Sequence, residues 1–459
     1  LYVVEFMNSH VFREYDIRGV VLQDFSKNFV ENLGRAFGTF LIENNQNKVS
    51  VSGDIRESTI GLKENFINGL LDTGLDVYDL GILTTPINYF SLFQTDITNS
   101  VQITGSHNPP EFNGFKLSLH KKPVYGDQIQ LIKKFIDKLD FDVGEGSETR
   151  YKILPDYHSM IKSKINIERE MNIVMDCGNA AGSINAPTIF KDLGIQLTEL
   201  YCEPDGSFPN HHPDPTVEEN LKDLIDEMKT GKYDAGIAFD GDADRLGVVD
   251  ETGEIIWADQ LIAIFLPDLI EPGDEIIFDV KCSQALEDMI KKYKGKPVMW
   301  KTGHSLIKNK MSESNCKLGG EMSGHIFFAD DYYGYDDAIY VAARLIQLLS
   351  KTDKTLSELK SAIPVYHSTP EIRLEADSDE EKFKIVKLAV EYFTKHNNCI
   401  TVDGVRIIYE NGWGLVRASN TQPVIVCRFE GNTSDNMNEI KKIVLDKLQE
   451  FGTLQTSGH

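Results

Sequence analysis

The sequence lacks any apolar run that approaches the ~20 residues of a membrane-spanning helix, so we expect no membrane as a partner. Residues 1–7 also lack the basic start and the cleavage site of a secretory signal peptide. Together, these absences predict a protein of the cytoplasm.

Cysteine is scarce, and no two cysteines form a C-x-x-C pair. This spacing argues against structural zinc and favours a reducing compartment, in agreement with a cytoplasmic location. The six cysteines are Cys177, Cys202, Cys282, Cys316, Cys399 and Cys427.

Basic residues are too few to balance the acidic ones, because 47 Lys and Arg stand against 71 Asp and Glu, a net charge of −24. Nucleic acid and acidic membranes repel such a protein and are not expected as partners. A small phosphorylated substrate is still allowed, since charges are screened over ~8 Å at physiological salt and local cations then decide binding.

Low-complexity tracts are absent, and 41% hydrophobic with 26% charged residues is the composition of a folded globular protein. At 459 residues the chain is too long for one core, which suggests three or four domains. Three segments share the layout strand, aspartate, turn, helix: residues 48–54, 172–182 and 275–282. This alternation predicts three similar α/β domains with parallel or mixed sheets.

After residue 370 the pattern changes to a smaller α+β domain with an antiparallel sheet. We expect its strands at 371–374, 405–409, 414–417 and 424–429, and its helices at 379–396 and 437–450. Breaks near 143–147, 250–253 and 368–370 divide the chain into domains 8–150, 151–253, 254–367 and 368–455.

Residues 240–245, Asp-Gly-Asp-Ala-Asp-Arg, are the most informative segment. Alternate side chains on a straight strand lie ~6–7 Å apart, too far to share one ion. The small residues Gly241 and Ala243 permit a tight curl that would bring Asp240, Asp242 and Asp244 around a hard divalent cation. A solvated acidic turn is the alternative.

Calcium and magnesium compete for this acidic loop. Counted from Asp240, Glu251 occupies the twelfth position of an EF-hand, but Arg245 stands where that loop needs glycine. An EF-hand also joins two helices, whereas residues 235–239 and 246–249 look like strands. Magnesium is therefore the better prediction.

Residues 104–116 display Ser106 on a loop that Pro109 and Pro110 stiffen. The pattern G-x-S-x-G of a serine hydrolase is absent. Ser106 can instead carry a phosphoryl group beside a cation, with His107 and Lys116 expected to neutralise charge. An ordinary Ser/Asn/Pro turn is the alternative.

Four further polar segments offer binding groups, although each alone also fits a polar turn or a helix cap. Residues 417–423, with an arginine, hydroxyls and an amide, suit a phosphate cradle. Residues 320–325 suit sugar hydroxyls through Glu321 and Ser323, and His325 can move a proton. The remaining two are residues 301–308 and 14–19.

Together these motifs resemble the α-D-phosphohexomutase superfamily, and most of all its bacterial phosphomannomutase/phosphoglucomutase branch. The resemblance runs from about Phe12 to about Phe451 and implies three alike domains and a smaller fourth around a central active-site cleft. The motifs, in order, are residues 15–19, 104–110, 240–245, 320–325 and 417–421. Gln422 is one mild departure.

The resemblance also implies roles for individual residues. Ser106 would be the phosphoserine, and it would hold Mg²⁺ together with Asp240, Asp242 and Asp244. Lys116, Arg245 and Arg18 would act as cations in catalysis, and His304, His325 and Lys281 would transfer protons or position groups. Substrate would be bound by the following residues: Tyr15, Lys281, Glu321, Ser323, Arg417, Ser419, Asn420 and Thr421.

The expected reaction is reversible transfer of phosphate between the 1- and 6-positions of mannose or glucose phosphates, through a bound glucose or mannose 1,6-bisphosphate. This fits the set of cations and the metal site, because phosphoryl transfer depends on positioning and charge stabilisation. The alternatives are a phosphoglucosamine mutase, a Mg²⁺-dependent sugar phosphatase and a non-catalytic sugar-phosphate sensor. Met322 favours the mannose/glucose branch over the glucosamine branch. We expect a monomer, with a dimer as the alternative.

Overall fold

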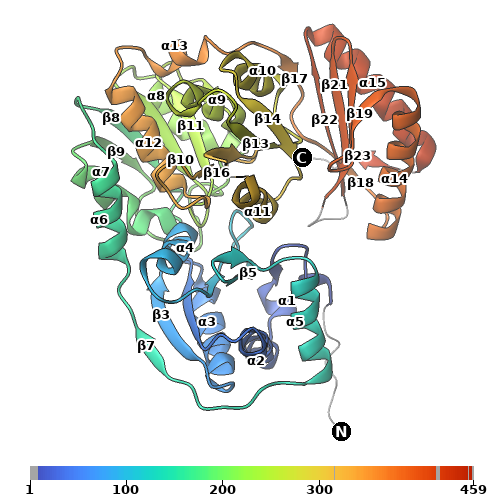
Figure 1. Ribbon diagram of the computed structural model, residues 1–459. Helices are drawn as coiled ribbons and strands as arrows, with labels where there is room; N and C mark the ends of the chain where they lie inside the picture. The colour runs from blue at the N-terminus through green and yellow to red at the C-terminus, as the bar shows by residue number, and fades with distance from the viewer. Residues whose placement is uncertain (1–8, 315, 420–423, 453, 457–459) are drawn as a thin grey trace. The chain divides into compact units, whose positions relative to one another are not determined.

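The computed structural model of the chain describes residues 9–314, 316–419, 424–452 and 454–456 (Figure 1). Spatial contacts divide the chain into two compact units. The first runs up to Ala258 and includes Ser323–Leu359, and the second consists of Asp259–Met322 and the residues from Lys360 onward. Among the described residues, none of the helices has the length and apolar character needed to cross a membrane.

The first sheet of the first unit is mixed, with strand order β1-β5-β4-β2-β3-β7 and β6 paired to β5. β4, β2, β3 and β7 run parallel, and β5 runs antiparallel to both β1 and β4. The strands are β1 Ile17–Val20, β2 Lys48–Gly53, β3 Asp76–Ile82, β4 Ser100–Ile103, β5 Phe112–Leu119, β6 Lys122–Pro123 and β7 Glu148–Arg150. The helices are η1 Ser9–Val11, α1 Val21–Asp24, α2 Lys27–Glu43, α3 Glu57–Leu71, α4 Thr85–Gln94 and α5 Asp127–Lys138.

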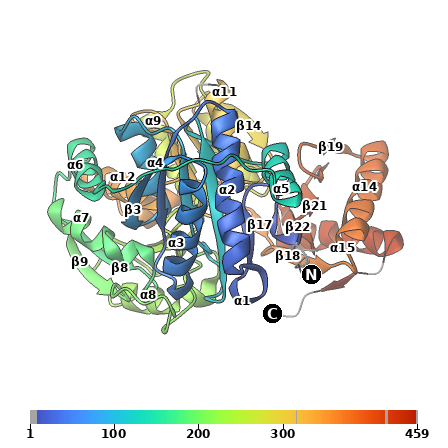
Figure 2. The same ribbon diagram turned by 90° about the horizontal axis from the view of Figure 1, so that it is seen from below.

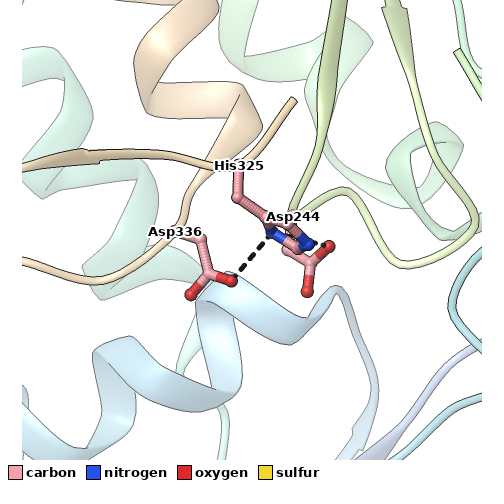
Figure 3. A group of neighbouring side chains, drawn as sticks. All are labelled: Asp244, His325 and Asp336. Atoms are coloured by element: carbon pink, nitrogen blue, oxygen red, sulfur yellow. Dashed lines mark ion pairs between the residues drawn. The ribbon is translucent and has the colours of Figure 1, made fainter. Parts of the chain in front are cut away.

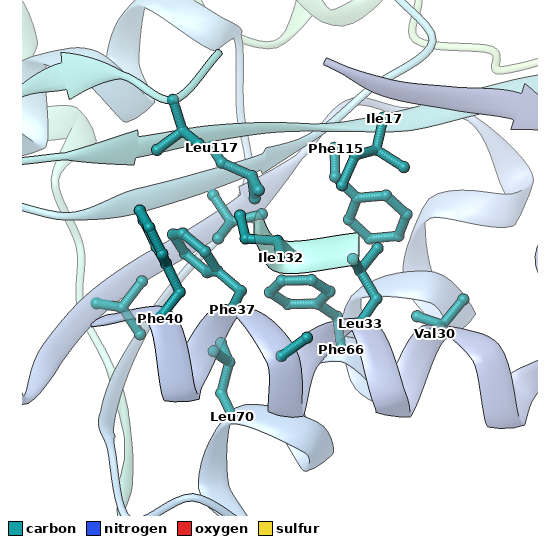
Figure 4. Packing of buried hydrophobic residues seen from close by; sticks show 14 of the residues in the cluster. Ile17, Val30, Leu33, Phe37, Phe40, Phe66, Leu70, Phe115, Leu117 and Ile132 are labelled. Atoms are coloured by element: carbon teal, nitrogen blue, oxygen red, sulfur yellow. The ribbon is translucent and has the colours of Figure 1, made fainter. Parts of the chain in front are cut away.

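Helices α2 and α3 lie side by side against this sheet (Figure 2). Apolar residues recur every three to four positions along α2, which gives the helix one apolar face toward the core. Figure 4 shows how Phe37 of α2, Phe66 of α3 and Phe115 of β5 fill the space between the two layers. The rings of Phe66 and Phe115 are stacked with their centroids 5.1 Å apart. This core includes Val101 and Ile103 of β4 and so fixes the strand after which the loop with Ser106 starts.

The second sheet of the first unit has strand order β12-β11-β10-β8-β9. β10, β8 and β9 are parallel, and β10 and β11 form an antiparallel pair in which Phe239 faces Leu246, as the sequence predicts for the flanks of the acidic loop. The strands are β8 Asn172–Asp176, β9 Gln196–Leu200, β10 Ala235–Phe239, β11 Leu246–Asp250 and β12 Ile255–Ile256. Its helical segments are α6 Leu154–Lys164, η2 Ala181–Ile184, α7 Ala186–Asp192, η3 Glu218–Leu221 and α8 Lys222–Met228.

Residues from later in the chain pack against this second sheet of the first unit. Helix α12, Ala338–Ser350, packs against β10, β11 and the short strand β16, Ile326–Phe328. The side chain of Asp337 caps α12 by accepting a hydrogen bond from the backbone N of Tyr340, 2.9 Å away. Helix α13, Leu356–Lys360, follows at the boundary of the unit.

The second unit contains a parallel sheet and an antiparallel one. In the parallel sheet, β13 Glu275–Asp279 pairs with β14 Lys296–Trp300 and with β15 Leu318–Gly320. Its helices are α9 Ala258–Leu269, α10 Gln284–Lys292 and α11 His304–Ser314. The antiparallel sheet has the order β19-β20-β21-β22-β18-β23, with β17 paired to β22.

The antiparallel sheet confirms the expected C-terminal α+β domain. Its core includes Val416 of β21, Phe429 of β22, Ile385 of α14 and Val444 of α15. The elements are β17 His367–Ser368, β18 Ile372–Glu375, α14 Asp379–His396, β19 Asn398–Ile400, β20 Val405–Tyr409, β21 Gly412–Ala418, β22 Val424–Gly431, α15 Ser434–Phe451 and β23 Gln455–Thr456. The sequence did not indicate β17, β19 and β23, which are only two or three residues long.

The expected fold class is confirmed, with mixed α/β sheets followed by a smaller α+β domain. The expected third domain, residues 254–367, has parts in each of the two units. The domain boundaries derived from the sequence stay a prediction.

Candidate active site

The acidic loop 240–245 joins β10 to β11 and is held in a tight curl by hydrogen bonds to Asp240. The Oδ1 atom of Asp240 accepts hydrogen bonds from the backbone N of Asp244 at 3.0 Å and of Arg245 at 3.1 Å. Ala243 supplies the turn with a left-handed φ of 60°. As a result, Asp240, Asp242 and Asp244 are fully buried and each has a carboxylate oxygen within 4.8 Å of the others.

The three carboxylates fit a divalent cation. The Oδ1 atoms of Asp242 and Asp244 are buried and accept no hydrogen bond from any residue that the structure describes. Buried carboxylate oxygens without donors are costly unless a cation or a proton satisfies them. An all-oxygen site of this kind suits a hard cation such as Mg²⁺ or Ca²⁺.

Lys116 of β5 partly neutralises this loop. Its Nζ atom lies 2.7 Å from Asp242 Oδ2 and 2.6 Å from Asp244 Oδ2. Burial acts to lower the pKa of Lys116, but the two carboxylates raise it well above its ordinary value. Burial likewise acts to raise the pKa of Asp242, and Lys116 outweighs it so that the pKa falls below its usual range. The pKa of Asp240 is raised well above normal by burial and by the charges of Asp244 and Asp242.

Ser106 lies on the loop after β4 and faces the acidic loop. Its backbone has a left-handed φ of 51°, and its Oγ donates to Asp240 Oδ2 at 3.3 Å. The same Oγ lies 3.2 Å from His107 Nδ1. Arg18 of β1 donates to the Asn108 side chain of the same loop at 3.1 Å and to Asp16 at 2.6 Å. The structure therefore brings the expected carrier serine, a cation and the acidic loop together within one unit.

The expectation that His107 neutralises charge is wrong. Burial, together with the charges of Arg245 and Arg18, holds the pKa of His107 well below its ordinary value. The ring is therefore neutral at pH 7 and contributes a polar contact to Ser106, not a positive charge.

Arg245, His325 and Asp336 form a chain beside Asp244. Arg245 Nε donates to His325 Nε2 at 3.0 Å, which requires that nitrogen to be unprotonated. Figure 3 shows the ring between two carboxylates, with Nδ1 3.0 Å from Asp336 Oδ2 and 3.5 Å from Asp244 Oδ1. The ring thus carries its proton on Nδ1, and His325 orients the Arg245 side chain.

The second unit holds another cluster of expected residues. Lys281, just after β13, lies 3.3 Å from Glu371 Oε2. Glu321 accepts a hydrogen bond from the backbone N of Gly303 at 2.5 Å, which fixes the turn before His304. Arg417 of β21 donates through Nε to Asp403 at 2.8 Å. The two cations are therefore held by carboxylates, and both are almost fully buried.

Thr302 connects the parts of this second cluster. Its backbone N donates to Asp403 at 3.1 Å, and its hydroxyl donates to Asp279 at 3.0 Å. Asp279 also accepts from the backbone N of Met322 at 3.1 Å, so one carboxylate at the end of β13 fixes both polar turns.

The structure places the sequence-derived residues in two sets. In the first unit it brings together the following residues: Arg18, Ser106, Lys116, Asp240, Asp242, Asp244, Arg245 and His325. In the second unit it gathers Lys281, Glu321 and Arg417 around the turn that precedes His304. Tyr15 lies half-buried in a bend before β1, and Ser323 lies in the turn before β16. Ser419 is buried at the end of β21, whereas Asn420, Thr421 and Gln422 lie outside the described residues.

Sequence patterns missed several residues that shape these clusters. Asp336 and Asp403 each contact an expected site residue, His325 and Arg417, from outside the motif that indicated it. His211 bonds Asp176 at 2.9 Å, and His212 donates to the carbonyl of His107. The adjacent His211-His212 pair was a usable signal, because histidine is scarce in this chain, with 11 among 459 residues.

Comparison with known proteins places the chain in a family. Four models of that family match in order: "Phosphoglucomutase/phosphomannomutase, alpha/beta/alpha domain I" at residues 9–143, domain II at 155–253, domain III at 257–366 and the C-terminal domain at 371–447. A Pseudomonas aeruginosa phosphomannomutase/phosphoglucomutase is 45% identical over 442 residues, which cover 96% of this chain and 95% of that protein. A Neisseria gonorrhoeae phosphoglucomutase is 40% identical and covers 94% of this chain and 95% of its own.

A solved structure agrees with these matches. A Burkholderia thailandensis protein of the phosphoglucomutase/phosphomannomutase family superposes with a TM-score of 0.91 at 38% identity, covering 97% of this chain and 99% of the other. The chain therefore has the organisation of the α-D-phosphohexomutases, which are isomerases. It belongs to the phosphoglucomutase/phosphomannomutase family.

Proposed function

We propose that the protein moves a phosphoryl group between the 1- and 6-positions of mannose and glucose phosphates, with Ser106 as the carrier. The observation that carries this proposal is the contact of Ser106 Oγ with Asp240, 3.3 Å away, at the edge of three buried carboxylates. Phosphoryl transfer needs a carrier held beside concentrated positive charge, and a cation in the acidic loop together with Lys116, Arg18 and Arg245 would supply it.

We propose Mg²⁺ as the cation, bound by Asp240, Asp242, Asp244 and an oxygen on Ser106. The strand flanks and Arg245 at the sixth position support Mg²⁺ over an EF-hand calcium site. When bound, Mg²⁺ would offset the carboxylates and polarise a phosphate oxygen. Lys116 holds two of these carboxylates in place, and Arg245, oriented by His325, would contact the transferring phosphoryl group.

We propose that Glu321 and Ser323 bind sugar hydroxyls. Arg417 and Ser419, with Asn420 and Thr421, would grip the phosphate that is not transferred. The burial of Arg417 and its bond to Asp403 support this role, because a guanidinium that a carboxylate holds in place presents a planar, fixed set of donors that matches a phosphate. Tyr15 would contact the sugar, and His304 and Lys281 would transfer protons or position the reacting hydroxyl.

The reaction would proceed in two halves. A sugar hydroxyl attacks the phosphorus on Ser106, its proton passes to a base, and the serine oxygen leaves, which yields a bound hexose 1,6-bisphosphate. The sugar then turns over, and its other phosphate returns to Ser106. Glucose or mannose 1,6-bisphosphate would therefore act as intermediate and activator. We further propose a cytoplasmic monomer; the six free thiols support the reducing location.

Intact-mass analysis tests the carrier. Wild-type enzyme treated with glucose 1,6-bisphosphate should contain a species heavier by one phosphoryl group, and Ser106→Ala should lack it and lose activity. Ser159→Ala, at an exposed serine of α6, is the matched control and should behave as wild type. Full activity in Ser106→Ala would overturn the proposal.

Coupled assays test the substrate and the reaction type. We expect turnover of mannose 1-phosphate and glucose 1-phosphate to exceed that of glucosamine 1-phosphate, with little release of inorganic phosphate. Phosphate release as fast as isomerisation would instead indicate a phosphatase.

A further inference from the structure

Arg56 is a fully buried arginine that the proposed reaction does not yet use. It lies between β2 and α3 and is 1% exposed. Its guanidinium uses all five of its N–H groups, four of them on the backbone of the loop that carries Ser106. Nη2 donates to the carbonyls of Ser106 at 2.7 Å and Asn108 at 2.6 Å, and Nη1 donates to those of Pro109 at 2.5 Å and Phe112 at 3.2 Å.

The fifth N–H group connects Arg56 to Asp54. Arg56 Nε donates to Asp54 Oδ2 at 3.0 Å, and the same carboxylate accepts from Thr104 Oγ1 at 2.8 Å and from the backbone N of Gly105 at 3.2 Å. Thr104 Oγ1 in turn accepts from the backbone N of Ser106 at 2.8 Å. The pair Asp54–Arg56 therefore holds this loop at its start, at Ser106 and at its end.

The loop needs such a partner. Pro109 and Pro110 have no N–H to donate to a helix or a strand ladder. The carbonyl of Pro109 accepts from the backbone N of Phe112 at 3.0 Å, while those of Ser106 and Asn108 are satisfied by Arg56. The fit is also close: a Cβ atom on Gly105 would lie 2.5 Å from Arg56 Cζ. The ring of Phe208 covers the guanidinium at 5.1 Å.

The contacts set the direction of the serine. The Ser106 carbonyl points to Arg56 while its Oγ points to Asp240, in a left-handed backbone conformation that is unfavourable for serine. Such a conformation persists only where surrounding contacts fix it, and Arg56 supplies the direct contact at this residue.

We propose that Arg56 is a positioning residue for phosphoryl transfer, which holds residues 106–112 so that Ser106 Oγ faces the acidic loop. This inference rests on the proposed carrier role of Ser106. The polar side-chain contacts of Arg56 are to the carrier loop and to Asp54, not to the proposed substrate-binding residues. Its loss should therefore lower kcat and leave the KM for hexose phosphate nearly unchanged. A fault in the fold as a whole would change both.

The test compares Arg56→Met and Arg56→Lys with Arg35→Met and Arg35→Lys. Arg35 is a partly exposed arginine of α2 that pairs with Asp72 at 2.7 Å, so its variants control for loss of an ion pair in the same domain. We expect Arg56→Met to lower kcat by about 100-fold, as for a reacting group displaced by about 1 Å, with KM changed less than threefold. Arg56→Lys, with three donors, should retain more activity, and added guanidinium should partly restore Arg56→Met.

Two further measurements keep the outcome decisive. The Mg²⁺-induced rise in Tm should persist in the Arg56 variants, which would show that the acidic loop is intact.

If Arg56→Met does not fold, Thr104→Val removes the hydroxyl between Asp54 and Ser106 and should still lower kcat selectively. A kcat within twofold of wild type in folded Arg56→Met overturns the inference, as does an unchanged kcat in Thr104→Val. If Ser106→Ala is active and wild type carries no phosphate, the carrier role fails instead, whatever the Arg56 variants show.

Discussion

The carbonyl oxygen of Ser106 occupies the place where a side chain of residue 241 would begin, because an ideal Cβ atom on Gly241 would lie 2.0 Å from it. The carrier loop and the acidic loop are thus in backbone contact, and only glycine permits this approach. The nearness of Ser106 to Asp240 follows from that contact, since both loops are otherwise fixed by separate sheets.

Gly241→Ala should therefore push the two loops apart. We expect a loss of about 1–3 kcal/mol in the free energy of unfolding, typical of an overpacked site, and a fall in kcat of at least tenfold, because the geometry of Ser106 changes. Urea unfolding and the coupled mutase assay measure the two effects. Gly61→Ala, in α3 with open space around it, is the control and should be stabilised by about 0.5–1 kcal/mol. Normal activity in Gly241→Ala would show that the backbone contact is not needed.

Metal binding should stabilise the protein through the acidic loop. After treatment with a chelator, adding Mg²⁺ should raise Tm, by the equivalent of about 2.7 kcal/mol at a concentration 100 times Kd. Asp242→Asn and Asp244→Asn should each reduce this rise, since each removes a buried carboxylate that lacks a hydrogen-bond donor on one oxygen. Asp226→Asn, on the exposed side of α8, is the control. An undiminished rise in the two loop variants would place the metal elsewhere.

Asp337 should give stability a specific pH dependence. Burial raises the pKa of Asp337 to about 6, although the carboxylate accepts from Tyr157 at 2.8 Å and Tyr332 at 2.6 Å. The folded state therefore binds a proton more tightly than the unfolded state, so this group destabilises the fold as pH rises from about 4 to about 6 and has a constant effect above that. Between pH 4 and pH 6 the free energy of unfolding should fall by an amount on the order of 3 kcal/mol because of this group.

A difference curve isolates this effect. The stability of wild type minus that of Asp337→Asn should fall between pH 4 and pH 6, because asparagine keeps the helix cap but does not titrate. Chemical unfolding at each pH measures it. A flat difference curve would show that Asp337 has an ordinary pKa in the folded protein.

Arg417 should contribute to substrate affinity. If it grips the phosphate that is not transferred, Arg417→Met should raise KM by about 10- to 100-fold, the equivalent of losing one charged hydrogen-bonded contact of about 1.5–3 kcal/mol. Initial rates over a range of glucose 1-phosphate concentrations give KM. Arg150→Met, at an exposed arginine of β7, serves as the comparison. An unchanged KM together with a lower kcat would contradict a role of Arg417 in substrate binding.

Sequence patterns predicted the local elements well, because those depend on neighbouring residues. The strands on either side of Asp240 and the helix 379–396 follow from periodicity and turn chemistry, and the structure confirms them. The motifs with charged or hydroxyl groups next to glycine also indicated Ser106, the acidic loop and Arg417.

Contacts between distant segments could not be predicted in this way. Arg56 lies 50 residues before Ser106, and nothing in its surroundings, an Asp-Ile-Arg-Glu turn, distinguishes it from a surface arginine. Asp336 reaches His325 because a β-bridge between Phe327 and Asp336 folds the intervening residues back. The charge of His107 was misjudged for the same reason, since burial and cations from other segments set its pKa.

Asp54, Asp176 and Asp279 stand at the ends of the equivalent strands β2, β8 and β13, and each holds a different partner: an arginine, a histidine, and a threonine with a backbone amide. An aspartate at the same kind of position thus anchors three unlike loops. Loops can be lengthened, exchanged or altered in sequence while the anchor and its strand stay constant, which gives this architecture a route to new substrates that leaves its cores untouched.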